Sequence, residues 1–102
     1  MNFSDYQKQA RRTARHGPHA DLNYALGLAG ETGELIELVK KCAFHGKEIR
    51  TEDVQKEAGD VLWYLANLCA EFGIDLEDVA QANIEKLQRR YPDGFMDGGG
   101  VR

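Results

Sequence analysis

The chain has few helix-breaking residues, few cysteines and no long apolar segment. Its 102 residues include only two prolines, at positions 18 and 92. The two cysteines, Cys42 and Cys69, stand apart within apolar runs, which argues against a disulfide framework or a zinc site. No apolar run approaches the roughly 20 residues that span a bilayer, so no membrane partner is expected. The segment Met1–Asp5 has no signal-peptide pattern, and we expect a cytoplasmic protein.

Positive charge is also scarce. The 13 Lys and Arg residues are outnumbered by 17 Asp and Glu residues, which gives a net charge of -4 at pH 7. Such a balance argues against a general nucleic-acid partner. It does not exclude one phosphate-bearing ligand that is held through a metal ion.

Strand-like alternation is missing throughout, and helical patterns fill the chain between the two prolines. We expect an all-α protein, an antiparallel four-helix bundle with short loops. Residues 1–92 should form the helical domain, and residues 93–102 a flexible C-terminal tail. The four predicted helices are 4–15 with Ser4 as N-cap, about 20–44 with Gly46 as C-cap, 51–72 with Thr51 as N-cap, and 75–91 with Asp75 as N-cap.

Two short stretches nearly repeat each other, and both place acids beside apolar positions. Glu31 and Glu34 flank Thr32-Gly33, while Glu57 and Asp60 flank Ala58-Gly59. On a helical wheel with the first acid of each unit at 0°, the second falls at about 300°, so the first acid lies inside the aliphatic stripe and the second lies on its edge. If the two helices pack antiparallel through these stripes, four carboxylates converge. The glycine in each unit costs about 1 kcal/mol in a helix interior, which suggests close helix approach or room for a ligand.

Carboxylates at such positions need a partner, because a bare charge on an apolar face is unfavourable. One interpretation is that they are solvated and pair with Lys40, Lys41 and Lys56. The other is a metal site. Di-iron bundles use a Glu-x-x-His unit, which this chain lacks. Oxygen ligands alone favour Mg²⁺, with Mn²⁺ as a possible substitute, and Mg²⁺ commonly joins carboxylates to substrate phosphates.

The last predicted helix carries two cations and an amide on one stripe. With Asn83 at 0°, Lys86 lies at about 300° and Arg90 at about 340°. These groups suit the phosphates of a polyphosphate ligand, or they simply complement the C-terminal helix dipole. Tyr64 lies one turn after Asp60, where it would contact substrate or pack in the core.

Three ordered motifs resemble the MazG-like, all-α nucleoside triphosphate pyrophosphohydrolases. The segments 27–35, 57–65 and 83–92 are similar to the family's first motif, its ExxD motif and its closing segment. The resemblance implies Mg²⁺-dependent cleavage of (deoxy)nucleoside triphosphates to monophosphate and pyrophosphate. It also implies that Glu31, Glu34, Glu57 and Asp60 bind the metal. Many members have Glu immediately before the first ligand, whereas this chain has Gly30, so the number of metal ions and the general base stay open.

The mechanism expected from these residues is attack of a water molecule on the α-phosphorus, with Glu31 or Glu34 accepting its proton. Asn83, Lys86 and Arg90 would bind phosphate oxygens. Two alternatives remain: a non-catalytic helical dimer that binds nucleotide or protein, and an enzyme like the phosphoribosyl-ATP pyrophosphohydrolases, which are similar in fold and acid pattern.

Self-association is expected from the third predicted helix, which is apolar almost all round. Leu65, Leu62, Ala66 and Trp63 spread from about 80° to about 240° on the wheel that places Glu57 at 0°. One small bundle cannot cover every side of such a helix, and exposed apolar patches usually mark interfaces. We expect a homodimer or a dimer-based homotetramer, as the family resemblance also implies.

Overall fold

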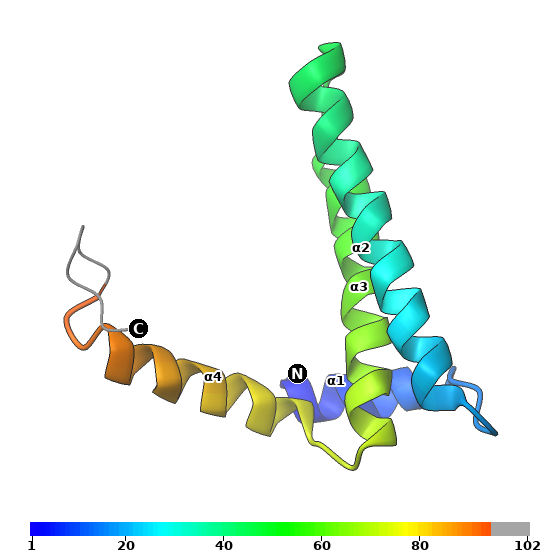
Figure 1. Ribbon diagram of the computed structural model, residues 1–102, viewed down its shortest axis with the longest axis vertical. Coiled ribbons are helices and arrows are strands. Elements are labelled where there is room, and N and C mark those ends of the chain that lie inside the picture. The colour runs from blue at the N-terminus through cyan, green and yellow to red at the C-terminus, as the bar shows by residue number, and fades with distance from the viewer. Residues whose placement is uncertain (95–102) are drawn as a thin grey trace.

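The computed structural model describes residues 1–94, which form four helices joined by short connections (Figure 1). They are α1 (Phe3–Arg11), α2 (Ala20–His45), α3 (Thr51–Glu71) and α4 (Leu76–Arg90). No strand occurs in these residues, so the all-α prediction is confirmed. None of the four helices is long and apolar enough to cross a membrane. The predicted tail, from residue 95 onward, lies outside the described residues.

Helix ends follow local capping chemistry, and here the sequence predictions were only partly right. Gly46, at φ 62°, ends α2, and the Asp75 side chain accepts the N–H of Glu77 at the start of α4, both as predicted. The prediction of Ser4 as N-cap is wrong. Asn2 is the N-cap, because its Oδ1 accepts the N–H of Asp5 at 2.8 Å, and α1 therefore begins earlier, at Phe3. That helix also ends at Arg11 rather than Arg15. In α3 the cap position falls one residue early, at Arg50.

The long helices α2 and α3 run side by side as an antiparallel hairpin, and α1 lies across the base of that hairpin (Figure 1). Buried Ala10, Ala66 and Leu76 form the centre of the core at the base. Partly buried side chains from α1 and α3, including Leu62 and Leu65, pack around them. The core is therefore small and sits at one end of the molecule.

The four-helix bundle expected from the sequence does not close within one chain. α4 runs away from the base and makes no contact with α2 (Figure 1). Its start is fixed by α1: Gln7 Nε2 donates to the carbonyl of Ile74 at 3.0 Å, and Gln7 Oε1 accepts the N–H of Leu76 at 2.9 Å. Glu77 Oε2 accepts the N–H of Phe3 at 2.9 Å. These bonds to α1 direct α4 away from the hairpin.

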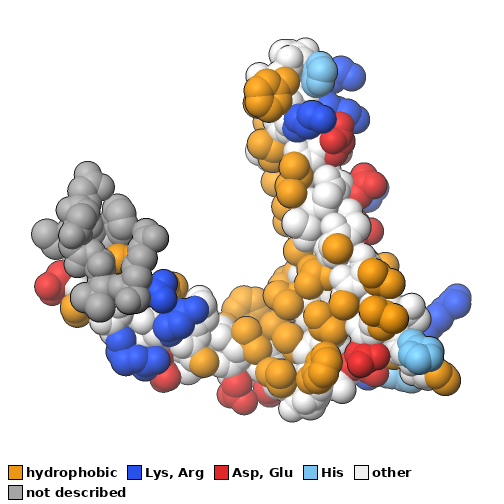
Figure 2. Space-filling view, in the orientation of Figure 1, with side chains coloured by type: hydrophobic (Ala, Val, Ile, Leu, Met, Phe, Trp, Pro, Cys, Tyr) orange, Lys and Arg blue, Asp and Glu red, His pale blue; other side chains and the backbone are white. Residues whose placement is uncertain are grey.

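The far end of the hairpin, here called the tip, contrasts with the base. An open groove of about 550 Å³ lies along the end of α2, between Leu35 and Phe44. Ile36, Val39 and Phe44 are largely exposed there, with Phe44 at 79% of its full accessibility. Figure 2 shows hydrophobic side chains along one edge of the hairpin toward this tip. The single chain leaves this apolar surface uncovered.

Candidate functional site

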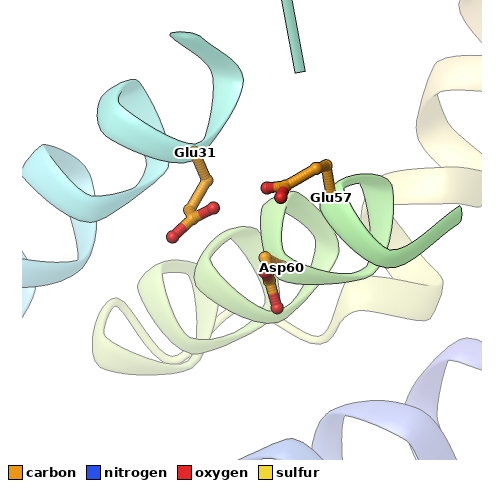
Figure 3. Close-up of side chains that lie close together, drawn as sticks. All are labelled: Glu31, Glu57 and Asp60. Atoms are coloured by element: carbon orange, nitrogen blue, oxygen red, sulfur yellow. The ribbon is translucent and has the colours of Figure 1, made fainter. Parts of the chain in front are cut away.

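Three of the four predicted acids meet midway along the hairpin. Glu31 projects from α2 toward Glu57 and Asp60 on α3 (Figure 3). One carboxylate oxygen from each of the three lies within 4.8 Å of the others. Spacing of i and i+3 places Glu57 and Asp60 on one side of α3, and antiparallel packing brings Glu31 opposite them. Glu34 is exposed and lies outside this group of three.

The electrostatics of the cluster follow from packing like charges on a partly apolar surface. Partial desolvation, followed by the negative charges of Asp60 and Glu57, raises the pKa of Glu31. A hydrogen bond with Glu57 and the charge of Glu34 act in the same direction. Mutual repulsion of this kind is relieved by a cation bound between the carboxylates.

The alternative in which lysines neutralise these acids has no support in the structure. Among residues 1–94, no ion pair joins the acids to Lys40, Lys41 or Lys56. The donor set also fits a hard divalent cation, because it offers carboxylate oxygens without nitrogen or sulfur. Glu31, Glu57 and Asp60 are thus suited to hold Mg²⁺.

The two mid-helix glycines do not mediate helix packing within the chain. A Cβ built on Gly33 or Gly59 would have no neighbouring atom within 4 Å. Close approach of α2 to α3 therefore does not explain them. The glycine that does permit close approach is Gly27, where a Cβ would overlap the Tyr64 ring. Sequence reasoning missed Gly27, although it lies at about 320° on the wheel of α2, on the stripe that faces α3.

Tyr64 is held in an aromatic cluster, as one of the two sequence interpretations expected. Its ring lies 5.0 Å from that of Trp63 in an edge-to-face arrangement and 6.4 Å from that of Tyr24. Such contacts add roughly 0.5–1.5 kcal/mol each beyond simple burial. Tyr64 also lines a pocket of about 350 Å³ at the α1–α2 connection. It therefore combines a packing role with access to an open cavity.

The predicted phosphate-binding residues all lie on α4, which contacts α3 but not α2. Asn83 and Lys86 are exposed on α4, and Arg90 is half-buried near its end. Since α4 does not contact α2, these residues lie apart from Glu31, although Asn83 lines a small cavity with Leu62 and Leu65 of α3. The structure thus unites the acids of α2 and α3 but leaves the cations of α4 on a separate arm.

Comparison with known proteins agrees with the motif pattern. Residues 20–95 match the family model of the MazG nucleotide pyrophosphohydrolase domain. The gene 37 protein of Mycobacterium phage L5 is 36% identical, over 98% of this chain and 97% of its own length. The YvdC protein of Bacillus subtilis strain 168 is 28% identical, over 89% of this chain and 97% of its own length. No solved structure gives a significant match.

The family match covers all of α2, α3 and α4, and thus every residue of the acid cluster. The two relatives extend the likeness over nearly the whole chain. The helical fold, the paired acid motifs and these matches agree, and the chain belongs to the MazG nucleotide pyrophosphohydrolase family.

Proposed function

We propose that this protein is a Mg²⁺-dependent hydrolase that cleaves (deoxy)nucleoside triphosphates to the monophosphate and pyrophosphate. The observation that carries the proposal is the meeting of Glu31, Glu57 and Asp60 across the α2–α3 hairpin. Family membership supports the reaction class. The free cysteines Cys42 and Cys69 suit the cytoplasm as its location.

When bound by the three carboxylates, Mg²⁺ would draw charge from the phosphates and acidify a bound water. The reaction forms a bond from water oxygen to the α-phosphorus and breaks the bond from that phosphorus to the bridging oxygen. Pyrophosphate leaves with the electron pair of that bond. The proton of the attacking water goes to a carboxylate.

Glu34 is the better candidate for accepting this proton. It lies outside the group of three and is exposed, so its oxygens remain available to water. Glu31 is the alternative, because its carboxylate lies in the cluster where the attacking water would be bound. Replacing Glu34 with Gln separates the two: a large fall in kcat with unchanged metal binding supports Glu34 as the base.

The proposal includes a homodimer or a dimer-based tetramer. The tip groove and the exposed Ile84 and Leu87 of α4 are apolar surfaces that a single chain leaves wet. A second copy that covers them would also bring Asn83, Lys86 and Arg90 of its α4 to the acids. Opposite charge favours this approach, because the acids lie on the hairpin and the cations on the arm.

A turnover screen tests the reaction. The protein is incubated with each common NTP and dNTP, and with phosphoribosyl-ATP, in the presence of Mg²⁺, and pyrophosphate release is measured. Release from a nucleoside triphosphate supports the proposal, and preference for phosphoribosyl-ATP would reassign the substrate. Nucleotide binding without any release would favour the non-catalytic alternative.

Subunit complementation tests the shared site. Asp60→Asn and Lys86→Ala should each be nearly inactive alone. After unfolding and refolding together, mixed dimers would contain one site with neither substitution, if α4 acts on the neighbouring subunit. Recovery of about a quarter or more of the wild-type rate is then expected, whereas no recovery would place α4 and the acids of one chain in the same site.

A further inference from the structure

The pocket at the α1–α2 connection combines aromatic walls with polar side chains that have no partner among residues 1–94. It measures about 350 Å³, which lies within the usual range of about 300–1,000 Å³ for small-molecule sites. Tyr24, Trp63 and Tyr64 supply the aromatic surface. The ring of Tyr24 lies edge-to-face with that of Trp63, at 5.8 Å. Flat, rigid walls of this kind suit a planar aromatic ligand.

Hydrogen bonds from Trp63 and Tyr24 fix two of the three aromatic side chains. Trp63 Nε1 donates to Thr13 Oγ1 at 2.9 Å, which ties α3 to the segment after α1. The Tyr24 hydroxyl donates to the carbonyl of Arg15 at 2.5 Å, which ties α2 to the same segment. Gly27 leaves room for the Tyr64 ring against α2. The aromatic surface is therefore already in place before a ligand arrives.

Some polar side chains on the lining have no hydrogen-bond or ion-pair partner among the described residues. Within the described part of the chain, the Asn23 amide and the Arg15 guanidinium take part in no hydrogen bond or ion pair, although both line the pocket. By contrast, the neighbouring His16 accepts from Arg11 through Nδ1, at 3.0 Å. An exposed amide beside an aromatic wall can pair with the donor and acceptor edge of a nucleobase.

The pocket also lies at a suitable distance from the acid cluster. On α2, Asn23 precedes Glu31 by eight residues, which is about 12 Å of helix. On α3, Tyr64 follows Asp60 by four residues, or about 6 Å. The two helices run antiparallel, so both offsets lead from the acids toward the same end of the hairpin. These offsets are on the scale of a nucleoside between its base and its 5′-phosphate.

We propose that this pocket holds the base of the nucleotide, with Asn23 reading the edge of the base and the Tyr24–Trp63–Tyr64 cluster contacting its ring. The assignment rests on the proposed function, because it takes the phosphates to lie at Glu31, Glu57 and Asp60. It makes Asn23 the specificity-determining residue of the chain. The phosphates would be held elsewhere, so changes at Asn23 should alter the choice of base and not the binding of phosphate.

Trp63 offers a direct measurement, because it is the only tryptophan of the chain and it lines the pocket. Its fluorescence is followed while AMP, GMP, CMP or UMP is added without divalent cation, with correction for nucleotide absorbance. Ribose 5-phosphate, which has no base, serves as the matched ligand control. We expect saturable quenching by at least one nucleotide and none by ribose 5-phosphate.

Three variants sharpen the measurement. Asn23→Ala should raise the Kd of the preferred nucleotide by about 3- to 10-fold, as expected for one lost hydrogen bond. Asn23→Asp loses the amide donor and should change the order in which the four nucleotides bind. Gln55→Ala, an exposed amide on α3 outside the pocket, should leave each Kd unchanged. Both substituted sites are exposed, so the fold should persist in all three variants.

The outcomes distinguish this proposal from the proposed function. If the protein hydrolyses nucleoside triphosphates but Asn23→Ala keeps the wild-type Kd and base order, the pocket assignment is overturned and hydrolysis stands. If nothing is hydrolysed but Trp63 still reports Asn23-dependent binding, the pocket stands and the hydrolase proposal fails. Equal quenching by ribose 5-phosphate would also overturn the assignment.

Discussion

The base and the tip of the hairpin are built from the same two helices but are completed in different ways. At the base, α1 covers α3, and Ala66 and Asn67 are fully buried there. At the tip, Ile36, Val39 and Phe44 are more than half exposed. The acid cluster lies between these regions, part of the way along α2 and α3. On the base side of the acid cluster, the chain itself covers the hairpin. On the tip side, a single chain leaves the apolar side chains exposed.

Because of this difference, one chain can be enough for a stable fold even if two chains are needed for function. The base can supply most of the stability of one chain, because it contains all five apolar residues that are buried within residues 1–94. The tip and α4 add exposed apolar surface, which is unfavourable until another surface covers it. Substitutions in the base should therefore change stability, whereas substitutions in the cluster, the tip and α4 should change assembly and catalysis.

The largest expected effect is on the cluster. Replacing Glu57 with Gln and Asp60 with Asn together should lower kcat/KM for the best triphosphate by more than about 100-fold. Millimolar Mg²⁺ should raise the melting temperature of the wild type by binding the folded state, and this rise should vanish in the double variant. Differential scanning fluorimetry with and without Mg²⁺ measures it. An equal rise in both proteins would contradict the metal site.

The base is tested by Gln7, a buried side chain that makes three hydrogen bonds to backbone groups. Gln7→Ala should lower the free energy of unfolding by about 2–4 kcal/mol, because buried carbonyl and N–H groups lose their partners. Urea denaturation measures the change. Gln9→Ala is the matched control, since Gln9 is exposed and its side chain, among the described residues, bonds only to Arg12. Similar losses in the two variants would mean that Gln7 does not hold α1 to the start of α4.

The tip is tested by a charge placed in its groove. Phe44→Glu should weaken self-association by at least about 10-fold, because a carboxylate is costly to bury in an apolar interface. Light scattering at micromolar concentration should then give a mass near 11.4 kDa. His45→Glu adds the same kind of residue beside the groove and should have little effect. A wild-type mass already near 11.4 kDa would refute the dimer.

The helices were largely predictable from the sequence, because their signals are local. Gly46 and Asp75 act through their own neighbours, and both were correctly assigned as caps. The path of α4 was not predictable in this way. It depends on Gln7, whose partners lie 59 to 69 positions away in the sequence. Helical periodicity shows which face of a helix is apolar. It does not show whether the residues that pack on that face come from the same chain or from another one.

The acid cluster was predictable for a similar reason. Helical wheels for α2 and α3, together with antiparallel packing of the two helices, are enough to bring Glu31, Glu57 and Asp60 together. The aromatic pocket was not. It forms where the α1–α2 connection meets α3, and irregular segments have no period to extrapolate. The one sequence feature that could have indicated the pocket is Gly27, a small residue that lies opposite the large Tyr64 side chain. Recognising this pair requires the register of α2 against α3, which the sequence does not give.

Gly27 and Gly33 lie on the same helix, α2, but only Gly27 has a side chain packed against it. Gly27→Ala should destabilise the protein by about 1–2 kcal/mol, since overlap with Tyr64 outweighs the gain in helix propensity. Gly33→Ala meets open space and should stabilise the single chain by about 0.5–1 kcal/mol. Thermal unfolding of both variants measures this. Loss of dimer in Gly33→Ala would show that the open space accommodates a second copy.

The smallest effect concerns the contact between α1 and α4, and it depends on pH. Ser4 Oγ donates to Asp75 Oδ1 at 2.8 Å, and this bond, followed by the one from the N–H of Glu77, lowers the pKa of Asp75. A carboxyl whose pKa is lower in the folded state stabilises the fold above its unfolded pKa, about 3.9 for Asp. That contribution is lost as the pH falls through the folded value. Ser4→Ala should therefore lower the melting temperature slightly at pH 6, and the difference from wild type should shrink as the pH falls through the lowered folded pKa of Asp75. A difference that grows on acidification would contradict the bond to ionised Asp75.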